Sequence, residues 1–419
     1  MRILIAASNR VIIGGIEKDL QILIPAFLRA GHEIGIVYEH RAVADEATVD
    51  PPAAHLPVWF WEDLKTHPAG WQEIACWGPQ VVYSQGPGSL ELERILLDHY
   101  PTVLYAHVYL GTCATGQKCH AFPQVRPCDR KFGPMCLALY YPRRCGGLNP
   151  RTAFEVYRGQ KRRRSQLARH RAILVASRHM FREFERHGIS RNKLHLVPLS
   201  IPEPNLQELP FTPRAPRGRI LFIGRLTHLK GVDHLIEAVP EASRKLGRAL
   251  TLTIAGEGPE RSRLENLAGE LGVAANFLGW LDPERKLDLM READLLAVPS
   301  LWPEPFGLVG LEAGCVGLPA AGYATGGITD WLIPGETGEL ASADPPTPRG
   351  LADAMVRALI EPEHHAALSR GAWQMAQRFT LEKRVRHLES ILQSACGLAP
   401  ARADMVACSA EQESAEDVL

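Results

Sequence analysis

Three features common in other proteins are missing from this chain of 419 residues, and each absence excludes a class of protein. No run of 18 apolar residues occurs, so we expect no helix that spans a membrane. The N-terminal segment lacks the long apolar region of a cleavable signal peptide, and residues 2–7 are instead typical of a first strand. Because the formal net charge is zero, no overall electrostatic field favours nucleic acid. The sequence therefore predicts a cytoplasmic protein that does not bind nucleic acid.

Length and composition predict two domains. Apolar residues make up 46% of the chain, which supports a sizeable core, and 419 residues fit two units of about 200 each. Six prolines and little periodicity between Pro198 and Pro216 indicate a linker. We expect a first domain at 1–200, a linker at 201–217, a second domain at 218–378, an amphipathic helix at 379–396 and a disordered tail at 397–419.

The first domain begins with an alternation of strand and helix. A strand at 2–7, a loop that ends in Gly14 and Gly15, a helix at 16–30 and a strand at 33–38 together start a doubly wound parallel sheet. The two glycines let the backbone approach a bound group and leave the helix N-terminus free for an anion, although any tight turn would also use them. Further strands are expected at 81–83, 102–106, 172–176 and 194–197.

His107 directly follows the strand expected at 102–106. It therefore lies at the sheet edge where doubly wound folds bind ligands. A lone histidine is more often structural, so contact with substrate and a packing role are both open for this residue.

The second domain starts the same alternation again. A strand at 219–223 is followed by Gly224, Arg225 and Lys230, and then by a helix at 232–246. Two cations five residues apart at the carboxyl end of a strand can flank one diphosphate, the arginine with a fork of donors and the lysine with a point charge. The same pair of cations is also common on protein surfaces that bind no diphosphate. Two more loops are expected at the same edge, one with Gly256 and Glu257 and one at 277–280 with Gly279.

The most informative stretch is 299–314. An apolar run at 293–298 predicts a buried strand, and the prolines on either side of Glu304 forbid a regular helix until Gly307. Glu304 thus lies on a loop, and Glu312 lies about two turns into the helix that follows. Carboxylates accept hydrogen bonds from hydroxyls, and free amides at the start of a helix hold an anion. The amides concerned belong to Gly307, Leu308 and Val309, which follow Phe306.

With seven residues between its two glutamates, this stretch resembles the Glu-x7-Glu signature of retaining nucleotide-sugar glycosyltransferases of the GT-B type, family 4. The segment from Gly224 to Lys230 also resembles that family's diphosphate-binding motif. The resemblance covers 1–396, strongly over 219–380 and more loosely over 1–200. It implies an α/β fold of two Rossmann-like doubly wound domains facing across a cleft. The second domain would hold the donor and the first the acceptor, and the helix at 379–396 would cross back onto the first domain.

The resemblance also implies roles for individual residues. Arg225 and Lys230 would bind the diphosphate of a UDP- or GDP-sugar, Glu304 the hydroxyls of the transferred sugar and Glu312 those of the ribose. His107 would lie near sugar and acceptor. Transfer would retain the anomeric configuration, need no metal and serve glycan, lipid-linked saccharide or polysaccharide biosynthesis on a carbohydrate or lipid-linked acceptor. The remaining donor contacts would come from Gly14, Gly15, Gly224, Gly256, Glu257, Gly279, Phe306, Gly307, Leu308 and Val309.

Two other functions remain open. A nucleotide-sugar 2-epimerase shares the two-domain shape and binds the same kind of donor, but its carboxylates are arranged differently. A non-catalytic binding subunit would not need intact cations and glutamates. The pair of Glu304 and Glu312 favours transfer.

Five cysteines fall within the stretch 112–150, which shows no clear periodicity. Clustered thiols could bind zinc, with Cys119, Cys128, Cys136 and Cys145 as ligands beside Cys113. Their spacing lacks the usual Cys-x2-Cys knuckle, so free thiols and a disulfide are equally open. Since the stretch leaves a strand beside His107, we expect it to cover the acceptor entrance.

The stretch 158–171 contains seven Arg and Lys residues and no acid. It is interpreted either as a solvated helix face or as a basic surface for an anionic acceptor or for peripheral contact with the inner face of a membrane.

Overall fold

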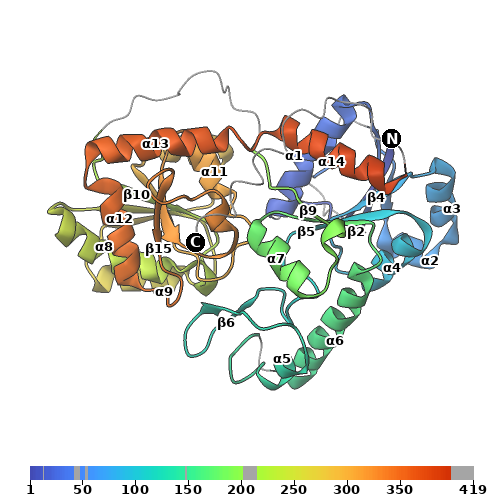
Figure 1. Cartoon of the computed structure of the whole chain (residues 1–419), viewed down its shortest axis with the longest axis horizontal. Helices are drawn as coiled ribbons and strands as arrows, with labels where there is room; N and C mark the ends of the chain where they lie inside the picture. The colour runs from blue at the N-terminus through green and yellow to red at the C-terminus, as the bar shows by residue number, and fades with distance from the viewer. Residues whose placement is uncertain (13, 42–47, 52–54, 147–148, 202–214, 398–419) are drawn as a thin grey trace.

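The computed structural model describes residues 1–12, 14–41, 48–51, 55–146, 149–201 and 215–397. These residues form two α/β domains that lie side by side, and a smaller arm projects from the first domain (Figure 1). Most of the predicted linker, 202–214, and nearly all of the predicted tail, 398–419, lie outside the described residues.

The first domain is built on a seven-stranded parallel sheet with the order β3-β2-β1-β4-β5-β8-β9. Every residue of β4 and β5 is buried, because helices cover both faces of such a sheet. The chain winds outward from β1 in both directions, which is the predicted doubly wound arrangement. The strands are β1 (Arg2–Asn9), β2 (Glu33–His40), β3 (Val58–Phe60), β4 (Val81–Ser84), β5 (Thr102–Ala106), β8 (Ala172–Val175) and β9 (Leu194–Leu196). The helices of the sheet are α1 (Gly15–Arg29), α2 (Trp61–Thr66), α3 (Pro68–Trp77), α4 (Leu90–His99), α7 (Arg178–Arg186) and the 3-10 turn η1 (Arg191–Lys193).

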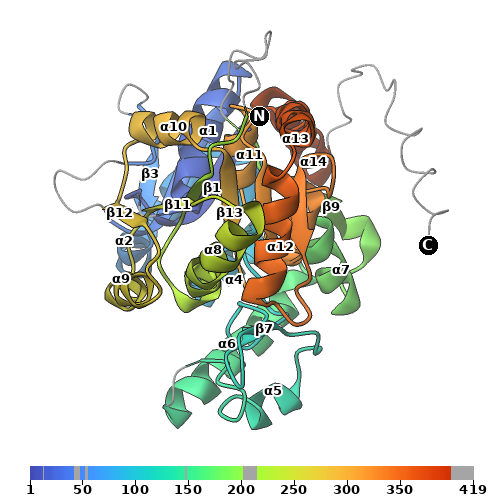
Figure 2. The same cartoon turned by 90° about the vertical axis from the view of Figure 1, so that its left-hand side faces the viewer.

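The arm lies between β5 and β8. It contains the two-stranded sheet of β6 (Cys119–His120) and β7 (Arg126–Pro127), then α5 (Pro134–Ala138) and the long α6 (Pro150–Leu167). Both views show it extending away from the two main sheets (Figures 1 and 2).

The second domain repeats the pattern with a six-stranded parallel sheet of order β12-β11-β10-β13-β14-β15. In α8 (Val232–Leu246) the apolar residues recur at helical spacing and are buried, which fixes this helix against the sheet. The strands are β10 (Arg219–Ile223), β11 (Thr251–Ala255), β12 (Ala275–Gly279), β13 (Leu295–Val298), β14 (Ala320–Tyr323) and β15 (Gly338–Ala341). The other helices are η2 (His228–Lys230), α9 (Arg261–Glu270), α10 (Pro283–Glu292), α11 (Val309–Gly314), η3 (Gly326–Asp330), α12 (Pro348–Leu359), α13 (Pro362–Ala376) and α14 (Leu381–Ala395).

The sheet orders confirm the predicted α/β class with two doubly wound domains, and several details of the prediction are wrong. Glu312 lies in the first turn of α11 and not two turns in, because the helix starts only at Val309. The segment 277–280 ends β12 and does not follow it. Sequence patterns did not predict β3, α2 or β15, since elements of three to six residues carry too little periodicity, and they also missed the ten-residue α3. The stretch 112–150 also contains short elements where none was expected.

Helix α14 lies against α1 of the first domain, so the two ends of the described chain are packed together (Figure 1). Arg384 on α14 forms a bidentate ion pair with Asp19 on α1. Nη2 donates to Oδ2 at 2.8 Å, and Nη1 donates to Oδ1. Both side chains are buried, and the guanidinium lies 5.3 Å from the ring centre of Tyr105. Burial opposes the charged form, but Asp19 outweighs it and the pKa of Arg384 is raised. This ion pair attaches the C-terminal helix to the first domain.

Replacing Arg384 by Ala should lower the free energy of unfolding by about 3–5 kcal/mol, because Asp19 would remain buried without its partner. Urea denaturation of the whole chain measures this. Arg386→Ala is the matched control on the same helix. Arg386 and its partner Glu382 are both exposed and lie 3.6 Å apart, so this ion pair contributes little to stability. Equal losses in the two variants would show that the buried pair does not hold α14 in place.

Candidate functional site

The carboxyl ends of β10 and β11 approach each other so closely that only glycine fits. A Cβ atom on Gly256 would lie 1.9 Å from the carbonyl oxygen of Gly224, and the φ of Gly256 is 142°. The amide of Gly256 donates to the carbonyl of Gly279 at 2.7 Å, so β12 joins the same edge. Three loops of the second domain thus meet at one place. Arg225 is exposed there, and Lys230 is half-buried on η2.

Glu304 is held at the same edge by three donors. Its Oε1 atom accepts from Lys230 Nζ at 2.5 Å, from Ser300 Oγ at 2.7 Å and from Trp302 Nε1 at 2.9 Å. The residue is only 6% exposed. A carboxylate has about four sites for accepted hydrogen bonds, and all three of these fall on one oxygen. The geometry therefore leaves Oε2 as an acceptor for further donors.

The loop after Glu304 turns sharply and then enters α11. Gly307 has a φ of 85°, which favours glycine. Within the described residues, the amides of Gly307, Leu308 and Val309 have no hydrogen-bond acceptor, as expected of a helix start. The predicted donor contact of Phe306 stays a prediction. Its side chain is 1% exposed, lies edge-on to Phe379 and belongs to the core.

Glu312 and Glu257 each have a cationic partner. Lys286 on α10 donates from Nζ to Glu312 Oε1 at 2.7 Å, and both side chains are partly exposed. Glu257 accepts from Arg261 on α9. Neither Lys286 nor Arg261 was identified from the sequence, because each lies on a helix with no local motif.

On the first domain, His107 lies beside β5 and donates from Nε2 to Gln85 Oε1 at 2.6 Å. That contact assigns the proton of the neutral imidazole to Nε2 and leaves Nδ1 as an acceptor. Burial, against an opposing effect of Asp19 and with a smaller contribution from Arg384, lowers the pKa of His107 to about 4. His107 is therefore neutral at neutral pH.

Residues from both domains meet around Tyr109. Burial raises the pKa of the Tyr109 phenol, and the charges of Glu183, Glu304 and Asp330 raise it further. Its hydroxyl is 2.9 Å from His179 Nδ1. Arg178 also crosses between the domains and donates from its backbone amide to Asp330 at 2.7 Å. The structure thus brings the edge near His107 and the edge that carries Glu304 to one site.

Gly14 and Gly15 start α1 at the carboxyl end of β1. Gly14 is the residue before the helix, and a Cβ there would lie 3.3 Å from Glu17 Oε2, while the space beside Gly15 is open. Glu17 itself is buried and accepts from Asn9 Nδ2 at 3.1 Å. No contact links these glycines to Glu304 or Lys230 in the described part of the chain.

The five arm cysteines are free thiols that lie near one another. Burial raises the pKa of Cys119 to about 12 and that of Cys145 to about 11, and neighbouring arm thiols add to both shifts. Among the described residues, no three His, Cys, Asp or Glu side chains are arranged to hold one metal ion. The structure therefore adds no support to zinc at Cys119, Cys128, Cys136 and Cys145, which stays a prediction.

The basic stretch 158–171 is partly helical, but two of its cations make hydrogen bonds within the first domain. Arg163 is 6% exposed, and it donates to Glu93 at 2.8 Å and to the carbonyl of Pro87 at 2.7 Å. Arg164 donates to the carbonyls of Phe132 and His187. The interpretation of this stretch as one exposed basic surface is therefore wrong at Arg163. No helix within the described ranges is long and apolar enough to cross a bilayer.

Comparison with known families gives this geometry a context. Residues 211–375 match the family of glycosyl transferases group 1. Over 176 residues the chain is 40% identical to a glycogen synthase of Mycobacterium tuberculosis, and the match covers 41% of each chain. Over 178 residues it is 34% identical to a D-inositol 3-phosphate glycosyltransferase of Corynebacterium jeikeium, covering 41% of this chain and 42% of the other. The chain thus matches about two fifths of the length of these curated relatives.

Solved structures resemble nearly the whole chain at low identity. Anabaena Alr3699/HepE, crystallised with UDP and glucose, has a TM-score of 0.64 and 17% identity over 94% of this chain and 100% of its own. Sucrose-phosphate synthase from Thermosynechococcus elongatus has a TM-score of 0.64 and 19% identity over 94% and 99%. These glycosyltransferase-like structures confirm the predicted GT-B fold.

The low pKa of His107 predicts a specific dependence of stability on pH. In the unfolded chain the imidazole binds a proton near pH 6.5, whereas in the native protein it stays neutral down to about pH 4. The unfolded state therefore binds more protons in this window, and stability falls as pH falls. We expect a steeper fall between pH 6.5 and 4 for the parent than for His107→Gln, measured by urea denaturation. Parallel curves for the two proteins, or an imidazole NMR titration of His107 near pH 6.5, would contradict this.

Proposed function

We propose that the protein is a retaining glycosyltransferase of family 4 that moves a sugar from a nucleotide-diphosphate sugar to a hydroxyl group of an acceptor. The observation that carries this proposal is the Glu304 carboxylate. It is buried and held on one oxygen by Lys230, Ser300 and Trp302. The match of 211–375 to glycosyl transferases group 1 supports it.

The donor is proposed to bind the second domain. Arg225 and Lys230 would contact the diphosphate, and the free amides of 307–309 would contact its oxygens or those of the sugar. Glu312 would accept from the ribose hydroxyls, with Lys286 fixing its carboxylate. UDP or GDP would serve as the nucleotide, and the UDP bound by Anabaena Alr3699/HepE supports the first of these.

The acceptor is proposed to bind the first domain. Its hydroxyl oxygen would form a bond to the anomeric carbon as the bond from that carbon to the diphosphate oxygen breaks, on the same face of the sugar. The hydroxyl proton would pass to the departing diphosphate oxygen. Arg225 and Lys230 would stabilise the charge that develops there, while Glu304 Oε2 would accept from a sugar hydroxyl. Neutral His107 would offer Nδ1 to a hydroxyl of the sugar or acceptor.

The products of a reaction with a panel of UDP- and GDP-sugars test this function. Retaining transfer predicts release of the nucleotide diphosphate and, with a suitable carbohydrate or lipid-linked acceptor, an α-linked product from an α-linked donor. Release of a free 2-epimer with no acceptor dependence would show an epimerase instead. No nucleotide-sugar binding at all would favour a non-catalytic subunit.

Removing either cation should damage the chemical step. Lys230→Ala and Arg225→Ala are each expected to lower kcat by a factor of about 100 or more, because each removes a donor to a developing charge worth roughly 3 kcal/mol. Arg244→Ala is the control, since this exposed arginine lies in the last turn of α8, at the opposite end of that helix from η2. Near-normal turnover in both site variants would remove the diphosphate assignment.

The proposed ribose contact makes a separate claim about binding. Glu312→Ala should weaken nucleotide binding about tenfold and leave kcat within a few-fold, because ribose hydroxyls are held equally before and during transfer. Calorimetry with UDP and GDP, together with steady-state kinetics, separates the two effects. If Glu312→Ala binds the preferred nucleotide as tightly as the parent, Glu312 does not contact the ribose.

A further inference from the structure

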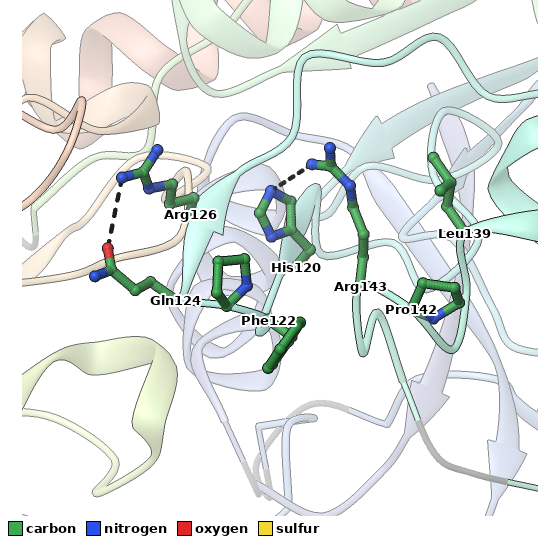
Figure 3. Close-up of a pocket in the computed structure, with 8 residues that line it drawn as sticks. His120, Phe122, Gln124, Arg126, Leu139, Pro142 and Arg143 are labelled. Atoms are coloured by element: carbon green, nitrogen blue, oxygen red, sulfur yellow. Dashed lines mark hydrogen bonds between the residues drawn. The ribbon is translucent and has the colours of Figure 1, made fainter.

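The arm carries a pocket of about 470 Å³ that the proposed transfer reaction does not use (Figure 3). One wall is the hairpin of β6 and β7, and the other is the segment after α5. The amides of Ala121 and Phe122 donate to the carbonyl of Arg143 at 3.0 and 3.1 Å, which fixes the two walls to each other. The volume falls within the usual range for small-molecule sites. The lining residues are His120, Phe122, Pro123, Gln124, Arg126, Leu139, Pro142 and Arg143.

The titratable residues that line the pocket are two arginines and one histidine, and none of the lining residues is acidic. Arg143 Nη1 lies 3.0 Å from His120 Nε2, and because a guanidinium can only donate, that imidazole nitrogen carries no proton. Burial lowers the pKa of His120, and the charge of Arg143 lowers it further. His120 is therefore a neutral support for Arg143, and the positive charge of the pocket belongs to the two arginines.

Neither arginine is neutralised by a close carboxylate in the described part of the chain. Arg126 Nη2 meets Gln124 Oε1 only at 3.5 Å, and its Nη1 is 4.0 Å from the carboxylate of Asp344, which is 95% exposed. The buried Nε atom of Arg126 has no hydrogen-bond partner among those residues. In Figure 3 both guanidiniums stand on the same side of the Phe122 ring. Donors left unpaired beside an apolar wall are suited to an anion.

The apolar residues of the lining indicate what kind of molecule carries that anion. The Phe122 side chain is half exposed, and Pro123, Leu139 and Pro142 complete a surface of carbon atoms. The guanidinium of Arg144 lies 5.4 Å from the Phe122 ring centre and adds a third cation at the rim. A fully hydrated small anion would leave these apolar groups uncovered, whereas an organic phosphate would cover them.

The pocket lies on the side of the arm that meets the second domain. Arg126 approaches Asp344 there, and Val125 packs against the core of the second domain with Ala343. The arm itself starts a few residues after His107, on the acceptor side of the proposed site. A group bound between Arg126 and Arg143 would therefore belong to the acceptor and not to the nucleotide.

We propose that this pocket binds the phosphate group of a phosphorylated acceptor, with Arg126 and Arg143 as its ligands and Phe122 against its carbon skeleton. The acceptor role rests on the proposed glycosyl transfer, but phosphate binding does not. The phosphate can come from a soluble sugar phosphate or from a lipid headgroup, and both sources present the same dianionic or diester oxygen atoms to the arginines.

Inorganic pyrophosphate tests the binding site directly. Because the proposed donor site would also bind it, calorimetric titrations are made on Lys230→Ala, which weakens that site alone. Adding Arg126→Gln and Arg143→Gln to this background should weaken binding at least about tenfold, through loss of two charge-assisted contacts. The matched control adds Arg158→Gln and Arg162→Gln, which remove the same charge from the exposed face of α6. Equal weakening in the two, or no effect in either, overturns the proposal.

Two further measurements complete the test. The double variant Arg126→Lys and Arg143→Lys should keep a large part of the affinity for pyrophosphate at an unchanged melting temperature. This result would show that the Gln pair weakens binding through loss of phosphate contacts and not through damage to the fold.

Sedimentation with phosphatidylcholine vesicles, with and without phosphatidic acid, identifies the source of the phosphate. Binding to phosphatidic acid that the Gln pair abolishes and the control pair keeps supports a lipid phosphate, and pyrophosphate binding without vesicle binding supports a soluble one. Absence of both kinds of binding in the parent overturns the site. Loss of pyrophosphate binding in Lys230→Ala together with absence of vesicle binding also overturns it, because that variant keeps the arm pocket intact.

Discussion

The three hydrogen bonds on one oxygen of Glu304 connect the parts of the second domain that the site depends on. Lys230 reaches this oxygen from η2 after β10, while Ser300 and Trp302 reach it from the loop after β13. A buried carboxylate is stable only when such donors surround it, so the loops after two neighbouring strands are fixed relative to each other. Gly326 completes the arrangement, because any Cβ there would collide with the backbone of Glu304 at 2.4 Å. Hydrogen bonds and close packing thus join the loops of the site to the sheet edge that carries them.

Much of the fold could be predicted from the sequence because its signals are local. The bounds of β5, β10 and α8 are those expected, since an apolar run or a helical spacing ends at a glycine or a polar turn in each case. The loop positions of Arg225, Lys230 and Glu304 followed from the same alternation. Ser300 and Trp302 could have been added, as both lie within four residues of Glu304.

Contacts between distant segments could not be predicted. Arg163 appears in the sequence as one of a run of surface cations, but Glu93, seventy residues earlier, buries it. Lys286 is paired with Glu312 from a different helix, and no spacing rule connects them. Phe306 lies in a motif that suggests ligand contact, and yet Phe379 and the core of the domain enclose it. In each case the partner becomes visible only when the sheets have been assembled.

The return of α14 to the first domain has a mechanical consequence. The chain passes between the domains near Ile201 and again near Thr380, and these two crossings form a parallel bridge in which the amide of Ile201 donates to the carbonyl of Phe379 at 3.1 Å. A single connecting strand would let one domain twist freely relative to the other. The bridge between Ile201 and Thr380 couples the two crossings, so the domains cannot move relative to each other without both crossings taking part. Any rearrangement that changes the distance between the edge near His107 and the edge that holds Glu304 therefore acts on this bridged pair.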